Sequence, residues 1–244
     1  NQVLQSNRDV NIEVDRVSQN FVLSNNEFNR VQDFAKQLEK EQEAVAYYSK
    51  ALQNQQVPYS IVKEHYEIVL NTLKEIDENQ LSLVNTLTDL SQQEKSIRDG
   101  LDVFELDLRN MKRTIEKYHL PGLPKEYLEL FFATSSRIEQ LSQLMNRVKL
   151  DMTEITGLNQ TIEDDVEKLD IMTEEIVDHA QLTEFMIQHA NRYRLDHPEI
   201  DTAIQQALEQ FNHFYRYEES LAIIEKALNQ VDPGSAQRVR DNYQ

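Results

Sequence analysis

The fold is decided by the stretch from Pro58 to Leu120, which reads PYSIVKEHYEIVLNTLKEIDENQLSLVNTLTDLSQQEKSIRDGLDVFELDLRNMKRTIEKYHL. It contains no further proline and a single glycine, Gly100. Apolar residues recur alternately four and three positions apart, and only Gln80 and Glu94 interrupt them. These sixteen positions, which we call the seam, are Tyr66, Val69, Leu73, Ile76, Gln80, Leu83, Leu87, Leu90, Glu94, Ile97, Leu101, Phe104, Leu108, Met111, Ile115 and Tyr118. A period of 3.5 residues keeps one face toward partner helices, which predicts a single helix of roughly 90 Å.

The composition favours long helices over a sheet. The 244 residues include only four glycines and five prolines, too few breakers for the turns of a many-stranded sheet. Charged residues make up 28% of the chain, which suits long solvated helices better than a thick globular core. The net charge of -18 argues against binding to nucleic acid or to an anionic membrane surface, and it favours basic patches on partners.

Cysteine usage and hydropathy bound the setting of the protein. The chain has no cysteine, which excludes disulfides and zinc-thiolate sites and fits a reducing, cytosolic compartment. No apolar run approaches the roughly 18 residues of a membrane span, and no signal peptide is visible. Because the chain begins within the heptad pattern, we expect it to be a fragment from which an N-terminal anchor is absent.

Turn signals divide the rest of the chain into helices. The run Leu120-Pro121-Gly122-Leu123-Pro124 is the clearest break, and Pro58 ends the helix before the long one. Periodicity alone would carry helices through Ser24 and Asp151. Each of these two residues is followed three positions later by glutamate, however, which is typical of a helix N-terminus. The predicted helices therefore span residues 1–23, 26–54, 59–118, 125–148 and 152–192.

The spacing of these turns indicates an internal repeat, because corresponding turns recur after 97 and 93 residues. We expect an all-α fold of two elongated, antiparallel three-helix bundles, residues 1–90 and 91–194, that share the long helix and resemble spectrin repeats. Shorter helices are predicted at about 197–212 and 216–230. They form a C-terminal hairpin and tail, residues 195–244, similar to part of a tetratricopeptide repeat, which should dock on the second bundle or on a partner.

Three segments carry a more specific resemblance. They are YHLPGLPKEY from Tyr118 to Tyr127, IQHANRYR from Ile187 to Arg194, and the tail that begins YEESL at Tyr217 and ends with the Asp-Pro-Gly of residues 232–234. Together they resemble the C-terminal half of the EzrA family, the septation ring formation regulators of Gram-positive bacteria with low genomic GC content.

The resemblance implies a protein of cell division. It implies a membrane-anchored rod on the cytoplasmic face of the cell membrane at the midcell division site, with the N-terminal anchor missing from this chain. It also implies binding to the tubulin-like division protein FtsZ, negative regulation of FtsZ ring formation, and scaffolding of other division and wall-synthesis proteins. No nucleic acid is expected as a partner, and a homodimer is left open.

A candidate partner-binding site follows from the same resemblance. The family's short patch named for Gln, Asn and Arg corresponds here to Gln188, Asn191 and Arg192, flanked by Tyr193 and Arg194. Two arginines and a tyrosine at a helix end are also the residue types enriched in binding hot spots. The alternative is an ordinary last turn, in which the arginines meet the helix dipole and Tyr193 packs on the terminal hairpin.

No catalytic constellation and no cofactor motif is found, so we expect the protein not to be an enzyme and not to hold a metal. Glu116 and His119 have the spacing of a di-iron helix bundle, but the second pair that such a site needs is absent. Polar positions within the heptads more often fix the register of helices than form a site; they are Gln80, Glu94, Asn159 and Thr173. The alternative to a division scaffold is a coiled-coil filament or tether that oligomerises through its helices.

Overall fold

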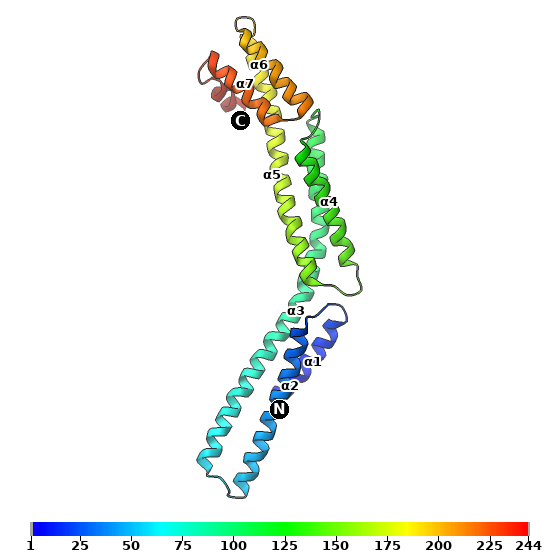
Figure 1. The fold of residues 1–244 in the computed structure, drawn as a ribbon, viewed down its shortest axis with the longest axis vertical. Helices are drawn as coiled ribbons and strands as arrows, with labels where there is room; N and C mark the ends of the chain where they lie inside the picture. Colours follow the sequence, from blue (N-terminus) through cyan, green and yellow to red (C-terminus); the bar gives the residue numbers. More distant parts are fainter. Residues whose placement is uncertain (1, 244) are drawn as a thin grey trace. The chain divides into compact units, whose positions relative to one another are not determined.

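The chain is built from α-helices (Figure 1). The computed structural model describes residues 2–243, and these residues form eight α-helices and no strand. The helices are α1 (Gln2–Ser18), α2 (Asn25–Gln53), α3 (Tyr59–Lys117), α4 (Lys125–Met145), α5 (Met152–Ala190), α6 (Pro198–Glu209), α7 (Tyr217–Val231) and α8 (Ser235–Tyr243), with a 3₁₀ turn η1 (Asn191–Tyr193) and a π-helical turn η2 (Gln210–Phe214). The predicted all-α class is confirmed.

Helix α3 is a single uninterrupted helix of 59 residues, about 88 Å long at 1.5 Å per residue. It begins directly after Pro58 and ends at Lys117, shortly before Pro121. None of the sixteen seam positions is exposed. The prediction of one continuous helix, without a reversal of the chain, is therefore confirmed.

The polar heptad positions differ in how their side chains are satisfied. Glu94 and Asn159 each hydrogen bond a side chain one turn away on the same helix. The Thr173 and Tyr127 hydroxyl oxygens, on α5 and α4, lie 2.7 Å apart in a buried hydrogen bond. Gln80 is fully buried, and neither its Oε1 nor its Nε2 atom has a hydrogen-bond partner within residues 2–243.

Packing divides the chain into two compact units, Asn1–Asp99 with Gln143–Gly157, and Gly100–Ser142 with Leu158–Gln244. The core of the first unit is formed by apolar side chains of α1, α2 and α3, among them Val10, Val14, Val17, Phe34, Leu38, Ile76, Leu83 and Leu87. The predicted repeats 1–90 and 91–194 and the region 195–244 describe the pattern of turns rather than these units. That division stays a prediction.

Two predicted helices end earlier than expected, and backbone pairing explains the end of α1. Helix α1 stops at Ser18 rather than near residue 23, and α4 stops at Met145 rather than at residue 148. In the first unit, the Val22 amide donates to the Leu150 carbonyl at 2.9 Å, and the Leu150 amide donates to the Asn20 carbonyl at 2.9 Å. Asn20 and Val22, which pair with Leu150, cannot also continue α1, so the heptad pattern predicted too long a helix there.

The two capping signals act differently. At the start of α5, the Asp151 Oδ1 atom accepts hydrogen bonds from the backbone amides of Thr153 and Glu154, at 3.1 and 3.3 Å. At the start of α2, the Ser24 hydroxyl instead donates to the Glu27 carboxylate and makes no cap to the backbone. Helix α5 begins at Met152 as predicted, and α2 begins at Asn25, one residue before the predicted start.

The C-terminal helices dock inside the second unit, on the last turns of α5 (Figure 1). Their shared core contains Leu182, Met186, Ala190, Ile200, Ala203, Ile204, Ala207, Leu221, Ile224, Ala227, Leu228, Ala236 and Val239. Docking on the second bundle, the first of the two predicted arrangements, is therefore observed. Helix α8 was not predicted; Ala236 and Val239 give it a buried face, so the segment expected to be a tail forms a helix that packs against the hairpin.

Two tyrosines of the second unit clamp the turn between α3 and α4. The Tyr217 hydroxyl donates to the Gly122 carbonyl at 2.6 Å. Burial raises the pKa of Tyr217 to about 12, so the hydroxyl stays protonated and remains a donor at neutral pH. The ring of Tyr215 lies so close to Gly122 that a Cβ atom there would be 2.4 Å from Cζ. This approach requires glycine in the Pro121–Pro124 turn.

We predict that Gln80→Leu raises the free energy of unfolding by about 1–3 kcal/mol, because it replaces a buried amide without partners by an apolar side chain. The measurement is urea unfolding followed by circular dichroism. Asn79→Leu, at the exposed neighbouring position, serves as the control and should change stability little. A loss of stability in Gln80→Leu would show that the amide has a partner in solution.

We predict that Gly122→Ala and Gly100→Ala change stability in opposite directions. The new methyl group at residue 122 must displace the Tyr215 ring, which costs about 1–3 kcal/mol. At residue 100, inside α3, a Cβ atom meets nothing within 4 Å, and alanine should stabilise the helix by about 0.5–1 kcal/mol. Thermal melts of both variants measure the two changes in stability. Equal changes would contradict the close contact between Tyr215 and Gly122.

Candidate partner-binding surface at the end of α5

The predicted site residues lie where α5 gives way to η1 in the second unit. Gln188, Asn191, Arg192 and Arg194 are exposed, and Tyr193 is half-buried. Ala190, among them in sequence, is fully buried in the hairpin core. The backbone at Ala190 and Arg194 keeps helical dihedral angles. The segment therefore continues the course of α5 and presents its polar side chains outward.

Tyr193 fastens this segment to the end of the hairpin. Its hydroxyl donates to the Asp232 Oδ2 atom, just after α7, at 3.1 Å. Its ring lies between the rings of His189 and His197, with centroids 5.9 and 6.4 Å away. For Tyr193, the observed contacts are those of the predicted alternative, in which the ring packs on the terminal hairpin.

The arginines of the site have different surroundings. Arg194 forms an ion pair with Asp201 of α6, which ties the connection to the next helix. Arg238 of α8 donates to the same Asp232 carboxylate at 2.7 Å. Arg192 is exposed and makes no ion pair or hydrogen bond within the described part of the chain. The structure thus brings the five predicted residues together, but it assigns Tyr193 and Arg194 to internal contacts and leaves Gln188, Asn191 and Arg192 facing solvent.

Electrostatics at this end are set by a small group of charges. Hydrogen bonds from Arg238 and Tyr193 lower the pKa of Asp232, so this carboxylate is ionised at neutral pH. Burial lowers the pKa of His189, and the positive charges of Arg192 and Arg238 lower it further against the opposing effect of Asp232. His189 is therefore neutral at pH 7, and the positive charge on the exposed surface comes from Arg192.

Sequence reasoning missed the partners that hold the surface. Asp201, Asp232 and Arg238 lie 7 to 46 positions beyond Arg192 or its neighbours and belong to the hairpin, and only the fold brings them near. It also missed Leu195, whose side chain is 96% exposed.

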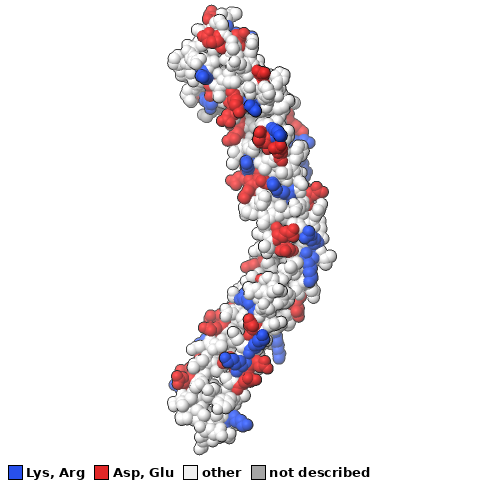
Figure 2. Space-filling model, in the orientation of Figure 1, with Lys and Arg blue, Asp and Glu red and all other residues white. Residues whose placement is uncertain are grey.

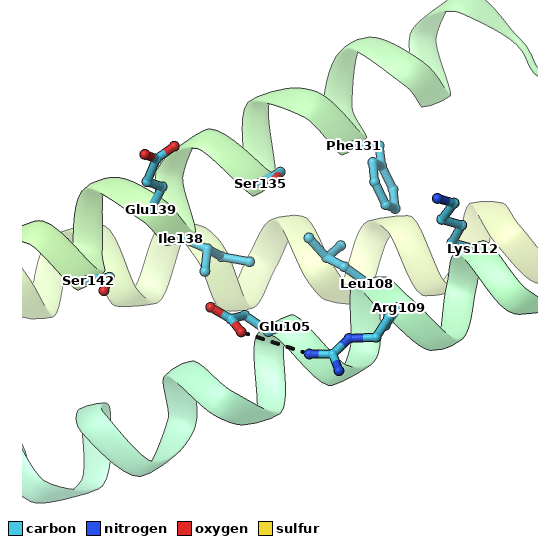
Figure 3. A pocket seen from close by; sticks show the side chains of 9 residues that line it. All are labelled: Glu105, Leu108, Arg109, Lys112, Phe131, Ser135, Ile138, Glu139 and Ser142. Carbon is cyan, nitrogen blue, oxygen red and sulfur yellow. Dashed lines mark ion pairs between the residues drawn. The ribbon is translucent and has the colours of Figure 1, made fainter.

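A groove lies between α3 and α4 of the second unit (Figure 3). Its volume is about 440 Å³, and it is lined by Glu105, Leu108, Arg109, Lys112, Phe131, Ser135, Ile138, Glu139 and Ser142. Glu105 and Arg109 form an ion pair at 3.9 Å. Among the described residues, neither Ser135 nor Ser142 makes a side-chain hydrogen bond to Glu105 or Glu139, so the lining shows no nucleophile activated by a base.

Glu116 and His119, the pair with the spacing of a di-iron helix bundle, do not form a metal site. Glu116 forms an ion pair with Lys112 at 3.8 Å. His119 lies after the end of α3 and has a left-handed backbone conformation, with φ of 50°. Between residues 2 and 243 no three His, Cys, Asp or Glu side chains are arranged to hold a metal ion.

Within residues 2–243, every helix is too short or too polar to cross a membrane. On the face shown in Figure 2, basic side chains lie among acidic ones rather than in one broad patch.

The fold and the exposed surface define a class of all-α proteins made of long packed helices. Comparison with known proteins specifies the family. The family model described as septation ring formation regulator, EzrA, matches residues 1–243, and the chain belongs to this family. Its predicted resemblance is thereby confirmed.

Individual relatives agree with this assignment. The chain is 38% identical over 240 residues to the septation ring formation regulator EzrA of Enterococcus faecalis, an alignment that covers 98% of this chain and 42% of the relative. It is 35% identical to the protein of the same name from Lactococcus lactis subsp. lactis and 32% to that of Streptococcus sanguinis, with 98% of this chain and 41% and 42% of the relatives covered. The chain thus spans about two fifths of the length of these curated relatives. No solved structure matches it significantly.

We predict that the second unit loses stability in acid through His189. Because its pKa is lower in the folded chain than in the unfolded one, protonation favours unfolding; stability is complete above about pH 6.5 and falls as the pH drops below that value. His189→Asn should reduce the slope of melting temperature against pH between pH 8 and pH 5. Gln188→Ala, an exposed neighbour that does not titrate, should keep it. An unchanged slope in His189→Asn would contradict this assignment.

Proposed function

We propose that this chain is part of a non-enzymatic scaffold that negatively regulates FtsZ ring formation in bacterial cell division. Membership in the septation ring regulator family supports the role in division. The observation that carries the proposal is the surface of Gln188, Asn191 and Arg192, three exposed polar side chains on a helix end whose neighbours are held by Asp201 and Asp232. Tyr193 and Arg194 belong to the proposed site as residues that position this surface.

The proposed mechanism follows from the assembly of FtsZ. FtsZ polymerises cooperatively, so a partner that binds subunits or short filaments more tightly than bundles raises the concentration at which long filaments form. Such a partner needs no catalytic group. A surface fixed by a buried helix end loses little conformational entropy on binding, which allows modest contacts to give useful affinity.

The setting of this activity is also part of the proposal. The full-length protein would be held on the cytoplasmic face of the cell membrane at midcell by an anchor outside this chain. There the two spectrin-like repeats, residues 1–90 and 91–194, and the hairpin 195–244 would present surfaces to FtsZ and to other division and wall-synthesis proteins. Nucleic acid is not proposed as a partner, because the net charge is -18.

A coiled-coil filament or tether remains the second candidate. The observation that favours it is Phe132 on α4, 67% exposed beside an apolar groove of about 340 Å³ that Leu123 and Leu128 also line. Helix pairing between chains would cover this face. Multi-angle light scattering distinguishes the two functions, since a filament or tether formed by pairing is an obligate multimer, whereas a scaffold that acts on FtsZ needs no such pairing.

The test of the proposed function is light scattering of purified FtsZ with GTP. We predict that the chain lowers the scattering or raises the critical concentration of FtsZ, and that Asn191→Ala and Arg192→Ala weaken this effect on the order of tenfold because they truncate exposed contact groups. Circular dichroism melts of both variants should match the unmodified chain.

The control is Arg113→Ala, an exposed arginine on α3 without an ion pair in the described residues, which should behave as the unmodified chain. If both site variants fold normally and still act on FtsZ at full strength, the surface is not the binding site. If the unmodified chain leaves FtsZ assembly unchanged, the proposed function of this part of the protein is wrong.

A further inference from the structure

The groove between α3 and α5 in the second unit has walls of a single charge. Its volume is about 480 Å³, and among the described residues no lysine or arginine lines it. Five carboxylates do line it, from Asp107 on α3 and from Glu163, Glu167, Asp170 and Glu174 on α5. The last four are spaced four, three and four positions apart within one continuous helix, so they lie on one face of α5. Such a groove attracts cationic groups and repels anionic ones.

The chain itself does not neutralise these carboxylates. Within residues 2–243 none of the five forms an ion pair, and Glu163 accepts a hydrogen bond only from the neutral Asn159 amide, at 2.9 Å. The groove on another face of α3 differs, because there Glu105 pairs with Arg109 (Figure 3). The negative charge of the α3–α5 groove is therefore left for a partner to neutralise.

The floor of the groove is apolar, and the groove has the length of a short helix. Phe104 and Met111 of α3 and Val166 of α5 form the floor, each with a few per cent of its surface exposed. Val103, one turn before Asp107 on the same face of α3, is 53% exposed. The groove follows about ten residues of α3, or roughly 15 Å. A groove between two packed helices accepts a third helix whose apolar side chains meet the floor.

We infer that the α3–α5 groove docks a basic, amphipathic helix of a partner protein, about three turns long. Its lysines or arginines pair with the carboxylates of the walls, and its apolar side chains cover Val103 and the floor. A single metal ion does not fit, because no three carboxylates within residues 2–243 are arranged to hold one. A basic partner is also the kind that the net charge of -18 favours. This groove is separate from the Gln188–Asn191–Arg192 surface and does not depend on the function proposed for it.

The experiment measures binding of the 244-residue chain to a labelled, designed helical peptide by fluorescence anisotropy. The peptide carries leucines on one face and lysines on the other, and its binding should weaken as the salt concentration rises. A peptide with glutamate in place of every lysine should not bind, and one with serine in place of every leucine should bind roughly tenfold more weakly. Glu167→Gln combined with Asp170→Asn should weaken binding of the first peptide roughly tenfold at low salt.

A second readout separates binding from folding. The double variant removes repulsion between like charges along α5, so the melting temperature of the free chain should stay the same or rise while binding weakens. The matched control is Glu75→Gln combined with Glu78→Gln, two exposed glutamates three positions apart on α3 in the first unit. It changes the net charge equally and should leave binding unchanged.

Three results would overturn the inference. One is equal weakening by the groove variant and the control, which would mean attraction to the acidic chain as a whole. Another is equal binding of the leucine and serine peptides, which would mean a polycation without an apolar contact. The third is a lower melting temperature of the groove variant, which would make the carboxylates part of the fold. FtsZ is absent from this experiment, so each of these results leaves the proposed function standing.

Discussion

Burial of one apolar seam along α3 is the constraint on which the fold depends. A helix of 59 residues has no intrinsic reason to stay straight and unbroken in water, and its stability comes from the helices that cover its seam. In the first unit these are α1 and α2, and in the second unit α4 and α5. Each unit therefore needs its own set of buried side chains, and the regular 3.5-residue period supplies a similar stripe to both. The seam is interrupted at Gln80 and Glu94, and at Gln80 the core contains amide atoms without partners within residues 2–243.

The loops follow a different rule from the helices. Backbone groups that leave a helix must find other partners, and here they do so by pairing with loops or side chains distant in sequence. Asn20, Val22 and Leu150 satisfy one another within the first unit, and the Arg98 side chain donates to the Met145 carbonyl at the end of α4, at 3.0 Å. In the second unit, the Gly122 carbonyl is satisfied by the Tyr217 hydroxyl. These contacts fix where the helices end.

This difference explains how far the sequence could be interpreted. The bounds of α3 and the starts of α2 and α5 were predictable, because the heptad period and signals at Pro58, Ser24 and Asp151 act over a few residues. The early end of α1 was not, because Val22 and Leu150 lie 128 positions apart and nothing local marks their pairing. Helix α8 was missed for a related reason: it is short, and only the packing of Val239 against the hairpin defines its buried face.

The candidate site shows the same division between local pattern and tertiary contact. A sequence match can point to Gln188, Asn191 and Arg192, but it cannot separate residues that bind a partner from those that hold the surface. The fold separates Tyr193 and Arg194, which Asp232 and Asp201 of the hairpin engage, from the residues that face solvent. The hairpin then has a structural task within the second unit: by burying Ala190 and fixing Tyr193, it keeps the exposed face in one conformation. A partner that binds this face meets a surface already ordered, so the entropy cost of binding falls mainly on the partner.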